Sequence, residues 1–468
     1  MSYPAAYLSS ASPQLGVPAM LNSDPLLQFK GARSIVKSIP ASTGSAVGPG
    51  TAVQFQIPMS TNGYIKPNSM YLRFRIDVTL DNTVVGANGA WWMFGGQNGS
   101  GTAPGPSIIA GQGTGGAGSV IDRATVMFPG GVTMTYNNYS HFRNAIVGPH
   151  CLSPDFVDND LRILESAGCI RDCSYSNVAG VNARSKAGYF VHPLDLPVFN
   201  SASAVPLLLL TGGITLEILT ASLVMALYTG STTDAPSATS YALSEMSLVY
   251  EELVVSPEFK SELIKFTQER PYSIGIADRT PLGIFDGASS IRINVGVGLS
   301  SVKAVVATQQ VPINSVATPK SYYCNAMNRW NLYLNGQQIT TANLDNEPAV
   351  YAEFQRALAR LFDHRLVSNV GTQRTFAGST EKSLYCKGQF AFGASTAVYD
   401  DAAFALSGVP VDQIAVEIER YASDTQDRVK WGVSDTTDNL IAGTSLFLWA
   451  LHDSVLTILP DGTVSIRK

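Results

Sequence analysis

The chain has 468 residues, about three times the ~150 residues of a common single domain, so its length predicts two structural units. Its residues are 45% hydrophobic and only 14% charged, which excludes a mostly disordered protein. Because few residues are charged, the surface of the protein is expected either to be rich in Ser, Thr, Asn, Gln and Gly or to be covered by other copies of the chain. The net charge is −5, and the first 40 residues hold only three basic side chains, Lys30, Arg33 and Lys37. These values exclude a basic N-terminal arm that binds nucleic acid. No direct sequence-specific nucleic-acid binding is expected.

The sequence predicts neither a cleavable signal peptide nor a membrane-spanning helix. Its first 16 residues lack both a basic region and an apolar core. The longest apolar runs, 204–210 and 446–451, are far shorter than the ~20 residues that cross a bilayer.

The cysteines and histidines favour a structural role over a chemical one. The five cysteines are an odd number without dense spacing, which predicts reduced and mostly buried thiols. They are Cys151, Cys169, Cys173, Cys324 and Cys386. Cys169 and Cys173 could meet on a helix, but zinc needs two further ligands and the five histidines are scattered singly. No metal and no cofactor are therefore expected.

The first half of the chain is dominated by alternation of apolar and polar residues. Residues 1–26 are rich in Ser, Ala and Pro and are expected to form an N-terminal arm. Alternation with a period of two then predicts half-buried strands at 53–57, 72–80 and 214–218. Short helices are expected at 139–146 and at 159–166.

A helix is predicted near the midpoint of the chain. Ser256 is an N-cap residue, Pro257 is tolerated in a first helical turn, and Glu258 suits the positive end of the helix dipole. An apolar stripe continues to Phe266, so the helix is expected to join two strand-rich halves as a linker over 257–266.

The second half repeats the strand-rich pattern. Strands are expected at 291–297, 332–334 and 414–418, and Asn335-Gly336 predicts a type I′ hairpin turn. A helix is expected from about Asn346 to Phe362, with Val350, Phe354, Leu358 and Leu361 on one side. Two separate runs, 445–451 and 455–459, then lead through a turn at 460–462 into a last strand at 463–466. The whole pattern predicts two tandem all-β sandwiches.

One segment departs from this pattern. Residues 86–118 contain 12 glycines in 33 positions and carry Trp91, Trp92 and Phe94. They are expected to form a long loop that emerges from the first sandwich. Its aromatic side chains either contact another subunit or cover the base of their own loop, and the sequence leaves both readings open.

No catalytic motif is convincing. Residues 111–116 match G-x-G-x-x-G, but a strand follows where a dinucleotide site needs a helix. His452 and Asp453 are adjacent in a predicted strand, so their side chains should point to opposite faces, and a structural role is expected. The pairs Glu251/Glu252 and Glu417/Glu419 are expected on a solvent or interface face rather than as paired glycosidase carboxylates. The protein is not expected to be an enzyme.

Several segments, in order, resemble the double jelly-roll major capsid proteins of the adenovirus–tectivirus lineage, most closely those of polinton-like viruses, virophages and adintoviruses. Residues 188–199 and 205–208 carry two Pro-Leu segments that lead into the strand at 214–219. Residues 329–339 are similar to the family's strand and Asn-Gly turn, which a helix follows at 351–362 as in the family. Residues 446–462 are similar to its final hairpin.

The resemblance implies two tandem eight-stranded jelly-roll sandwiches with a few short helices and long loops. It places the first jelly roll at 27–256 and the second at 267–468. It further implies homotrimers that act as pseudo-hexameric capsomers in an icosahedral virion, assembled inside the host cell. Partners would be neighbouring capsomers, minor capsid or penton proteins, and an internal membrane or its proteins.

Three other classes fit the sequence less well. A trimeric fibre or receptor-binding protein should show coiled-coil or repetitive segments. A carbohydrate-binding or hydrolytic β-sandwich protein should offer convergent carboxylates or an aromatic platform, for which Trp91 and Trp92 are the one candidate. A single-jelly-roll capsid protein with a projecting domain should carry a basic arm and a Pro/Gly hinge.

Overall fold

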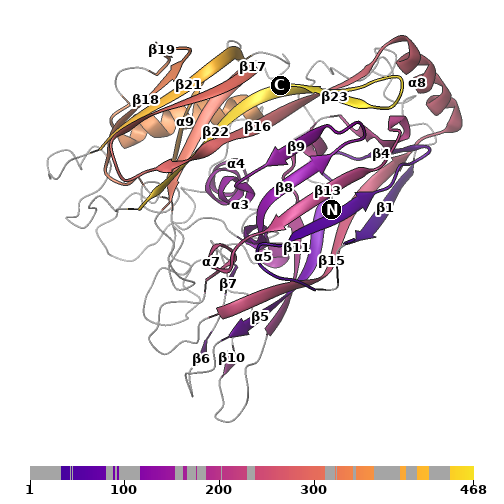
Figure 1. Ribbon diagram of the computed structural model, residues 1–468, viewed down its shortest axis with the longest axis horizontal. Helices are drawn as coiled ribbons and strands as arrows, with labels where there is room; N and C mark the ends of the chain where they lie inside the picture. Colours follow the sequence, from indigo (N-terminus) through magenta and orange to yellow (C-terminus); the bar gives the residue numbers. More distant parts are fainter. Residues whose placement is uncertain are drawn as a thin grey trace.

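The computed structural model shows two antiparallel β-sandwiches that are joined by one helix, α8 (Pro257–Glu269) (Figure 1). It describes residues 33–42, 44, 46–80, 88–89, 92–93, 116–152, 162–165, 175–176, 186–201, 203–228, 238–310, 322, 324–340, 344–362, 390–396, 408–420 and 443–468. The expected N-terminal arm, 1–26, and most of the glycine-rich segment lie outside these residues. Within them, no helix is long and apolar enough to span a membrane.

The first half contains two facing sheets. One holds β11 (Lys186–Pro193), β5 (Tyr71–Leu80), β15 (Ala238–Val254), β4 (Gly63–Ile65) and β12 (Val205–Pro206), with β1 (Arg33–Pro40) and β2 (Ala46–Val47) alongside β15. The other holds β3 (Ala52–Ile57), β13 (Ile214–Thr220), β8 (Ile121–Met127) and β9 (Thr133–Tyr136). Alternate residues of β5 from Leu72 to Val78 are fully buried, as the period of two predicts.

Eight strands build the second half. They are β16 (Tyr272–Asp286), β17 (Ile291–Gln310), β18 (Met327–Leu334), β19 (Gln337–Gln338), β20 (Ala391–Ser395), β21 (Val409–Arg420), β22 (Ser445–Ile458) and β23 (Val464–Arg467). The first part of β17 pairs with β21, and after register shifts between Gly296 and Val302 its second part pairs with β22 and β20. This change of partners wraps the strands around one core, which contains Trp330 of β18 and Trp449 of β22.

The remaining described elements are short. They are β6 (Asn88–Gly89), β7 (Trp92–Met93), β10 (Tyr175–Ser176), β14 (Leu227–Tyr228), η2 (Ala117–Val120), α5 (Arg162–Glu165), α6 (Pro197–Asn200), η5 (Leu207–Leu209) and α7 (Leu223–Ala226). Of these, α5 occupies the middle of the helix expected at 159–166.

The expected caps and turns are present. The Ser256 hydroxyl accepts the Phe259 N–H at 3.3 Å and caps α8. This helix ends at Glu269 instead of Phe266, because its buried side continues through Thr267. At the hairpin between β18 and β19, Asn335 and Gly336 have φ values of 47° and 81°, and positive φ at both positions is the mark of a type I′ turn.

The two other expected helices are confirmed with changed ends. Helix α9 (Glu347–Phe362) buries Val350, Phe354 and Leu358 completely, and the Asn346 side chain accepts the Ala349 N–H at 3.0 Å. The helix expected at 139–146 is longer: α3 (Tyr139–Phe142) continues through a π-helical turn, η3 (Arg143–Val147), into α4 (Gly148–Cys151). All residues from 139 to 151 are buried. The alternation of polar and apolar residues from which a helix end is predicted is therefore absent in this segment.

The prediction of two separate strands at 445–451 and 455–459 is wrong. Strand β22 is continuous from Ser445 to Ile458. His452, Asp453 and Ser454 interrupt the apolar pattern without interrupting the strand, because all three polar side chains are buried and bonded.

The two hydrophobic cores do not divide at the linker helix. The first core includes Tyr272, Ile274 and Ile276 of β16, Leu456 and Ile458 of β22, and Val464 of β23. The second core includes Phe142, Ala145, Ile146, Val147 and Cys151 of the helical segment 139–151. Among the described residues every strand pairing stays within one half. The halves are therefore joined by side chains of each half that pack in the core of the other, and not by a shared sheet.

Candidate functional site: a buried polar junction between the halves

The helical segment 139–151 belongs to the first half and contacts the second half. The His141 ring stacks on Phe447 with 4.0 Å between centroids, and Phe142 meets Trp449 edge-on at 5.3 Å. Both partners belong to β22, so one face of this helix is part of the second core.

An arginine of the second half is held by the first half beside this helix. Arg279 of β16 donates through Nη1 to the Asp195 carboxylate at 2.6 Å and through Nη2 to the Asp195 carbonyl at 2.8 Å. Its guanidinium lies 4.2 Å from the centroid of the Phe142 ring, with Tyr136 and Tyr139 at 5.5 and 5.8 Å. A planar donor held on two oxygens and a ring has one orientation, so this contact fixes direction as well as distance.

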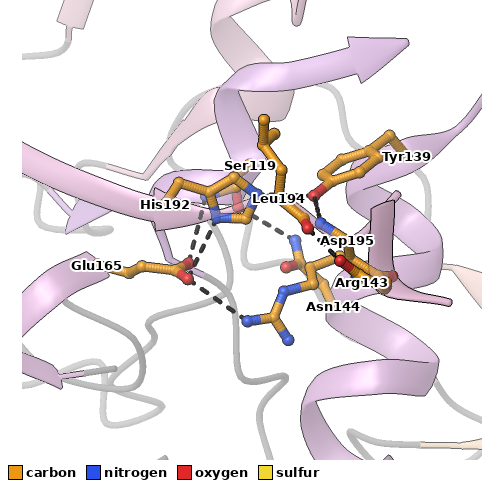
Figure 2. A network of polar contacts seen from close by, with 10 residues as sticks. Ser119, Tyr139, Arg143, Asn144, Glu165, His192, Leu194 and Asp195 are labelled. Atoms are coloured by element: carbon orange, nitrogen blue, oxygen red, sulfur yellow. Dashed lines mark hydrogen bonds and ion pairs between the residues drawn. The ribbon is translucent and has the colours of Figure 1, made fainter. Parts of the chain in front are cut away.

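Asp195 is also tied to a polar chain inside the first half (Figure 2). Its backbone N–H donates to the Tyr139 hydroxyl at 2.8 Å, and that hydroxyl is hydrogen-bonded to His192 Nε2 at 2.8 Å. His192 Nδ1 lies 3.2 Å from the Glu165 carboxylate, which also accepts from Arg143 at 3.4 Å. The chain therefore connects β11, α3, α5 and the π-helical turn.

The electrostatics of this site favour the ionised carboxylate of Glu165. Burial alone would raise the pKa of Glu165, but His192 and Arg143 outweigh it and hold that pKa below its usual value. Burial raises the pKa of Tyr139 well above that of a free phenol, so its hydroxyl stays protonated. Gly118 is required beside the imidazole, because a Cβ there would lie 2.6 Å from His192 Cε1.

A second belt of polar groups lies across the middle of β16 and β22. Thr280 is hydrogen-bonded to His452 Nε2 at 2.8 Å, and Ser454 donates to Asp278 at 3.1 Å. On β17, Lys303 forms a buried ion pair with Asp453 at 2.7 Å. Burial lowers the pKa of His452, against the opposing charge of Asp278, so its neutral form is favoured.

The arrangement is suited to holding the fold together rather than to catalysis. Tyr139, His192 and Glu165 have the order of a proton relay, yet their exposures are 0%, 0% and 2%. Asp278, His452 and Ser454 are equally closed off. A substrate could not reach either set, whereas each polar group needs an internal partner because it is buried.

The outcome for the other acidic pairs is mixed. Glu417 accepts the Tyr333 hydroxyl at 2.7 Å, and Glu419 pairs with Arg329 on a partly exposed face, as expected. Glu252 contradicts the expectation of an outward-facing pair, because it is only 5% exposed and bonds to Ser60. It faces inward because its neighbour on the strand, Glu251, takes the outer face.

The residues singled out from the glycine-rich segment are mostly outside the described part of the chain. Trp91 and Phe94 lie there, and Trp92 is described only as part of β7, opposite Tyr228 of β14. Their role in subunit contacts stays a prediction.

The cysteines and metal ligands are described in part. Cys151 and Cys324 are buried, while Cys169, Cys173 and Cys386 lie outside the described residues. Among the residues that are described, no group of three or more His, Cys, Asp or Glu side chains is placed to hold a metal ion.

Sequence reasoning missed the junction itself. Arg279 and Asp195 are 84 positions apart, and nothing in the sequence pairs them. The available signal was a charged side chain inside an otherwise alternating strand: Asp278-Arg279 in β16, and His192 beside the apolar run of β11.

Comparison with solved structures shows which known folds this architecture is similar to. No protein-family model and no curated protein match the sequence. In structure, the chain is similar to the PBCV-1 Vp54 capsid protein fitted into a reconstruction of the virophage Sputnik, with a TM-score of 0.58, 14% identity and coverage of 94% of this chain and 98% of that one. A cryo-EM chain of the Sputnik virophage gives a TM-score of 0.56 at 10% identity, covering 93% and 88%. The mavirus major capsid protein gives 0.52 at 9% identity, covering 97% and 95%. At such low identity these matches concern the fold, and the chain has the double jelly-roll fold that was expected from the resemblance.

Proposed function

We propose that the chain is a major capsid protein that builds the shell of an icosahedral virion. The observation that carries the proposal is the coverage: 97% of this chain aligns with 95% of the mavirus major capsid protein. Because the alignment extends over both halves of the chain, it supports a similar placement of the two sandwiches in the two proteins. That placement is what a tile-shaped subunit needs.

In this proposal the working unit is a homotrimer, in which six sandwiches form a pseudo-hexameric capsomer. Its partners are neighbouring capsomers, minor capsid or penton proteins, and an internal membrane or its proteins. The net charge of −5 supports a shell that does not itself bind nucleic acid by sequence. The chain would act without catalysis, metal or cofactor.

The domain bounds follow the same proposal: an arm at 1–26, a first jelly roll at 27–256, a linker at 257–266 and a second jelly roll at 267–468. The junction supports this role, because a subunit that tiles a shell must keep a fixed angle between its sandwiches. Arg279, with two hydrogen bonds to Asp195 and a ring beneath it, holds that angle.

Trp91, Trp92 and Phe94 of the loop at 86–118 are proposed as contacts between subunits. Glycine gives such a loop no preferred conformation, so its aromatic side chains need a surface to order them. Burying one ring contributes about 1.5–3 kcal/mol, enough to strengthen an interface.

Light scattering of the purified chain after size-exclusion chromatography tests the proposed unit. A trimer of three 49.8-kDa chains, or larger particles built from it, is the expected result. A monomer that persists over a wide range of salt and protein concentration would count against the capsid role.

A further inference from the structure

Two neighbouring strands serve both cores of the molecule. β16 and β22 pair along nearly their whole length, from Tyr272 opposite Ile458 to Asp286 opposite Ser445. At one end, Leu456 and Ile458 are buried in the first core, although they belong to the second half by sequence. At the other end, β22 is buried in the second core from Leu446 to Leu451.

The last hairpin is also bonded to the first half through its backbone. The Thr211 N–H and hydroxyl both donate to the Gly462 carbonyl, at 3.2 and 3.3 Å. The Val464 N–H donates to the Pro129 carbonyl at 3.3 Å. Figure 1 shows this hairpin, in yellow, extending from the second half above the first half toward α8.

The turn of the hairpin fits the first half closely. Gly462 has φ +76°, and a Cβ there would lie 2.8 Å from both the Leu209 carbonyl oxygen and the Thr211 nitrogen. Backbone atoms cannot move aside as a flexible side chain can. A side chain at position 462 would therefore push the hairpin away from its seat.

We propose that the ribbon formed by β16, β22 and β23 is a strap that completes the core of the first sandwich. Without it, the apolar side chains that pack on Leu456, Ile458 and Val464 would be open to water. The strap is made after the rest of the first sandwich during synthesis, so that sandwich closes only when the C-terminal hairpin docks. Release of this hairpin is then a local opening that exposes the first core while the second core stays folded. This inference rests on the packing alone and stands whether or not the chain forms a capsid.

Two leucines on β22 provide a matched test. Leu456 and Leu448 are both buried, at 0% and 1% exposure, but Leu456 lies in the first core and Leu448 in the second. Leu456→Ala and Leu448→Ala would be compared by native-state hydrogen exchange of the full chain. We expect Leu456→Ala to raise exchange at least tenfold in β13 and β8, more than in β18 and β21. Leu448→Ala should show the reverse order.

The strap is excluded if Leu456→Ala speeds exchange only in β16, β22 and β23 and leaves β13 and β8 as in the parent chain.

A milder pair keeps the test usable if either alanine variant fails to fold. Gly462→Ala and Gly336→Ala both place a side chain in a hairpin turn at positive φ, +76° and +81°, but Gly336 has open space around it. The conformational strain is therefore matched, and only the contact with the first half differs. We expect faster exchange in β13 for Gly462→Ala and not for Gly336→Ala. Equal exchange in β13 for both variants would contradict the strap.

Discussion

The two ends of β22 differ from its middle in how they hold the molecule together. Each end is apolar and lies in a different core, whereas His452, Asp453 and Ser454 in the middle bond to polar groups of β16 and β17. Next to this middle section, Arg279 reaches across to Asp195. Apolar contact therefore joins the halves at the ends of the ribbon, and the directional contact of Arg279 with Asp195 joins them beside its centre.

The difference separates two physical tasks. Burial of apolar area stabilises the assembly of the halves but tolerates small shifts, because the hydrophobic effect has no direction. A buried ion pair adds little net stability, since desolvation offsets its attraction, but it is costly to break and fixes geometry. We therefore expect the centre to set the angle between the sandwiches and the ends to supply most of the stability.

The largest effect is expected from Arg279→Ala, which leaves the Asp195 carboxylate without its cation. Removing one partner of a buried pair costs about 3–5 kcal/mol, and the partial exposure of Asp195 favours the lower value. Denaturant unfolding would measure the loss. Arg292→Ala is the control, because Arg292 is exposed and stacks on Tyr333 at 4.5 Å, and it should cost less than about 1 kcal/mol. Equal losses for the two variants would mean that the junction is no stronger than a surface contact.

A smaller effect, equal in size, is expected from removing one methylene from each core. Ile458→Val removes one methylene from the first core and Ile418→Val removes one from the second, and both side chains are 1% exposed. Each variant should lose about 1 kcal/mol of unfolding free energy. A loss at Ile418 with none at Ile458 would show that the end of β22 adds nothing to the first core.

The polar centre should make stability depend on pH. Burial holds the pKa of His452 below the unfolded value of about 6.5, so the unfolded chain binds the proton more readily. Stability should therefore fall as pH drops below about 6.5, by up to about 1.4 kcal/mol per pH unit for this one group. The comparison is between the parent chain and His452→Gln from pH 7.5 to pH 5. The variant should show a shallower slope, and identical slopes would rule out His452 as the source.

The smallest effect on the single chain is expected from the double variant Trp91→Ser, Trp92→Ser. If these side chains contact another subunit, the unfolding of each sandwich should change by less than about 0.5 kcal/mol, as for surface positions in general. The trimer should dissociate at higher protein concentration than the parent. A variant that loses fold stability with an unchanged trimer would support the other reading, in which the tryptophans cover their own loop.

Local patterns in the sequence predicted the helices and strands well where one face of the element is buried and the other is exposed to solvent. The strand at 72–80, the Ser256 cap and the Asn335-Gly336 turn each depend on neighbouring residues, and each is present. Prediction failed where burial is complete. β22 was split at His452 because polar residues normally end a buried strand, and Glu252 was placed outside because its partner Ser60 is distant in sequence. The pairing of Arg279 with Asp195 depends on how the halves meet, which no local pattern records.

Electron cryo-microscopy of the purified full-length chain tests the central claim most directly. The account predicts trimeric particles with a pseudo-hexagonal outline, in which each chain contributes two sandwiches held at one angle, and shells under conditions that favour assembly. Particles that are single chains, or in which the two sandwiches take many relative angles, would contradict it.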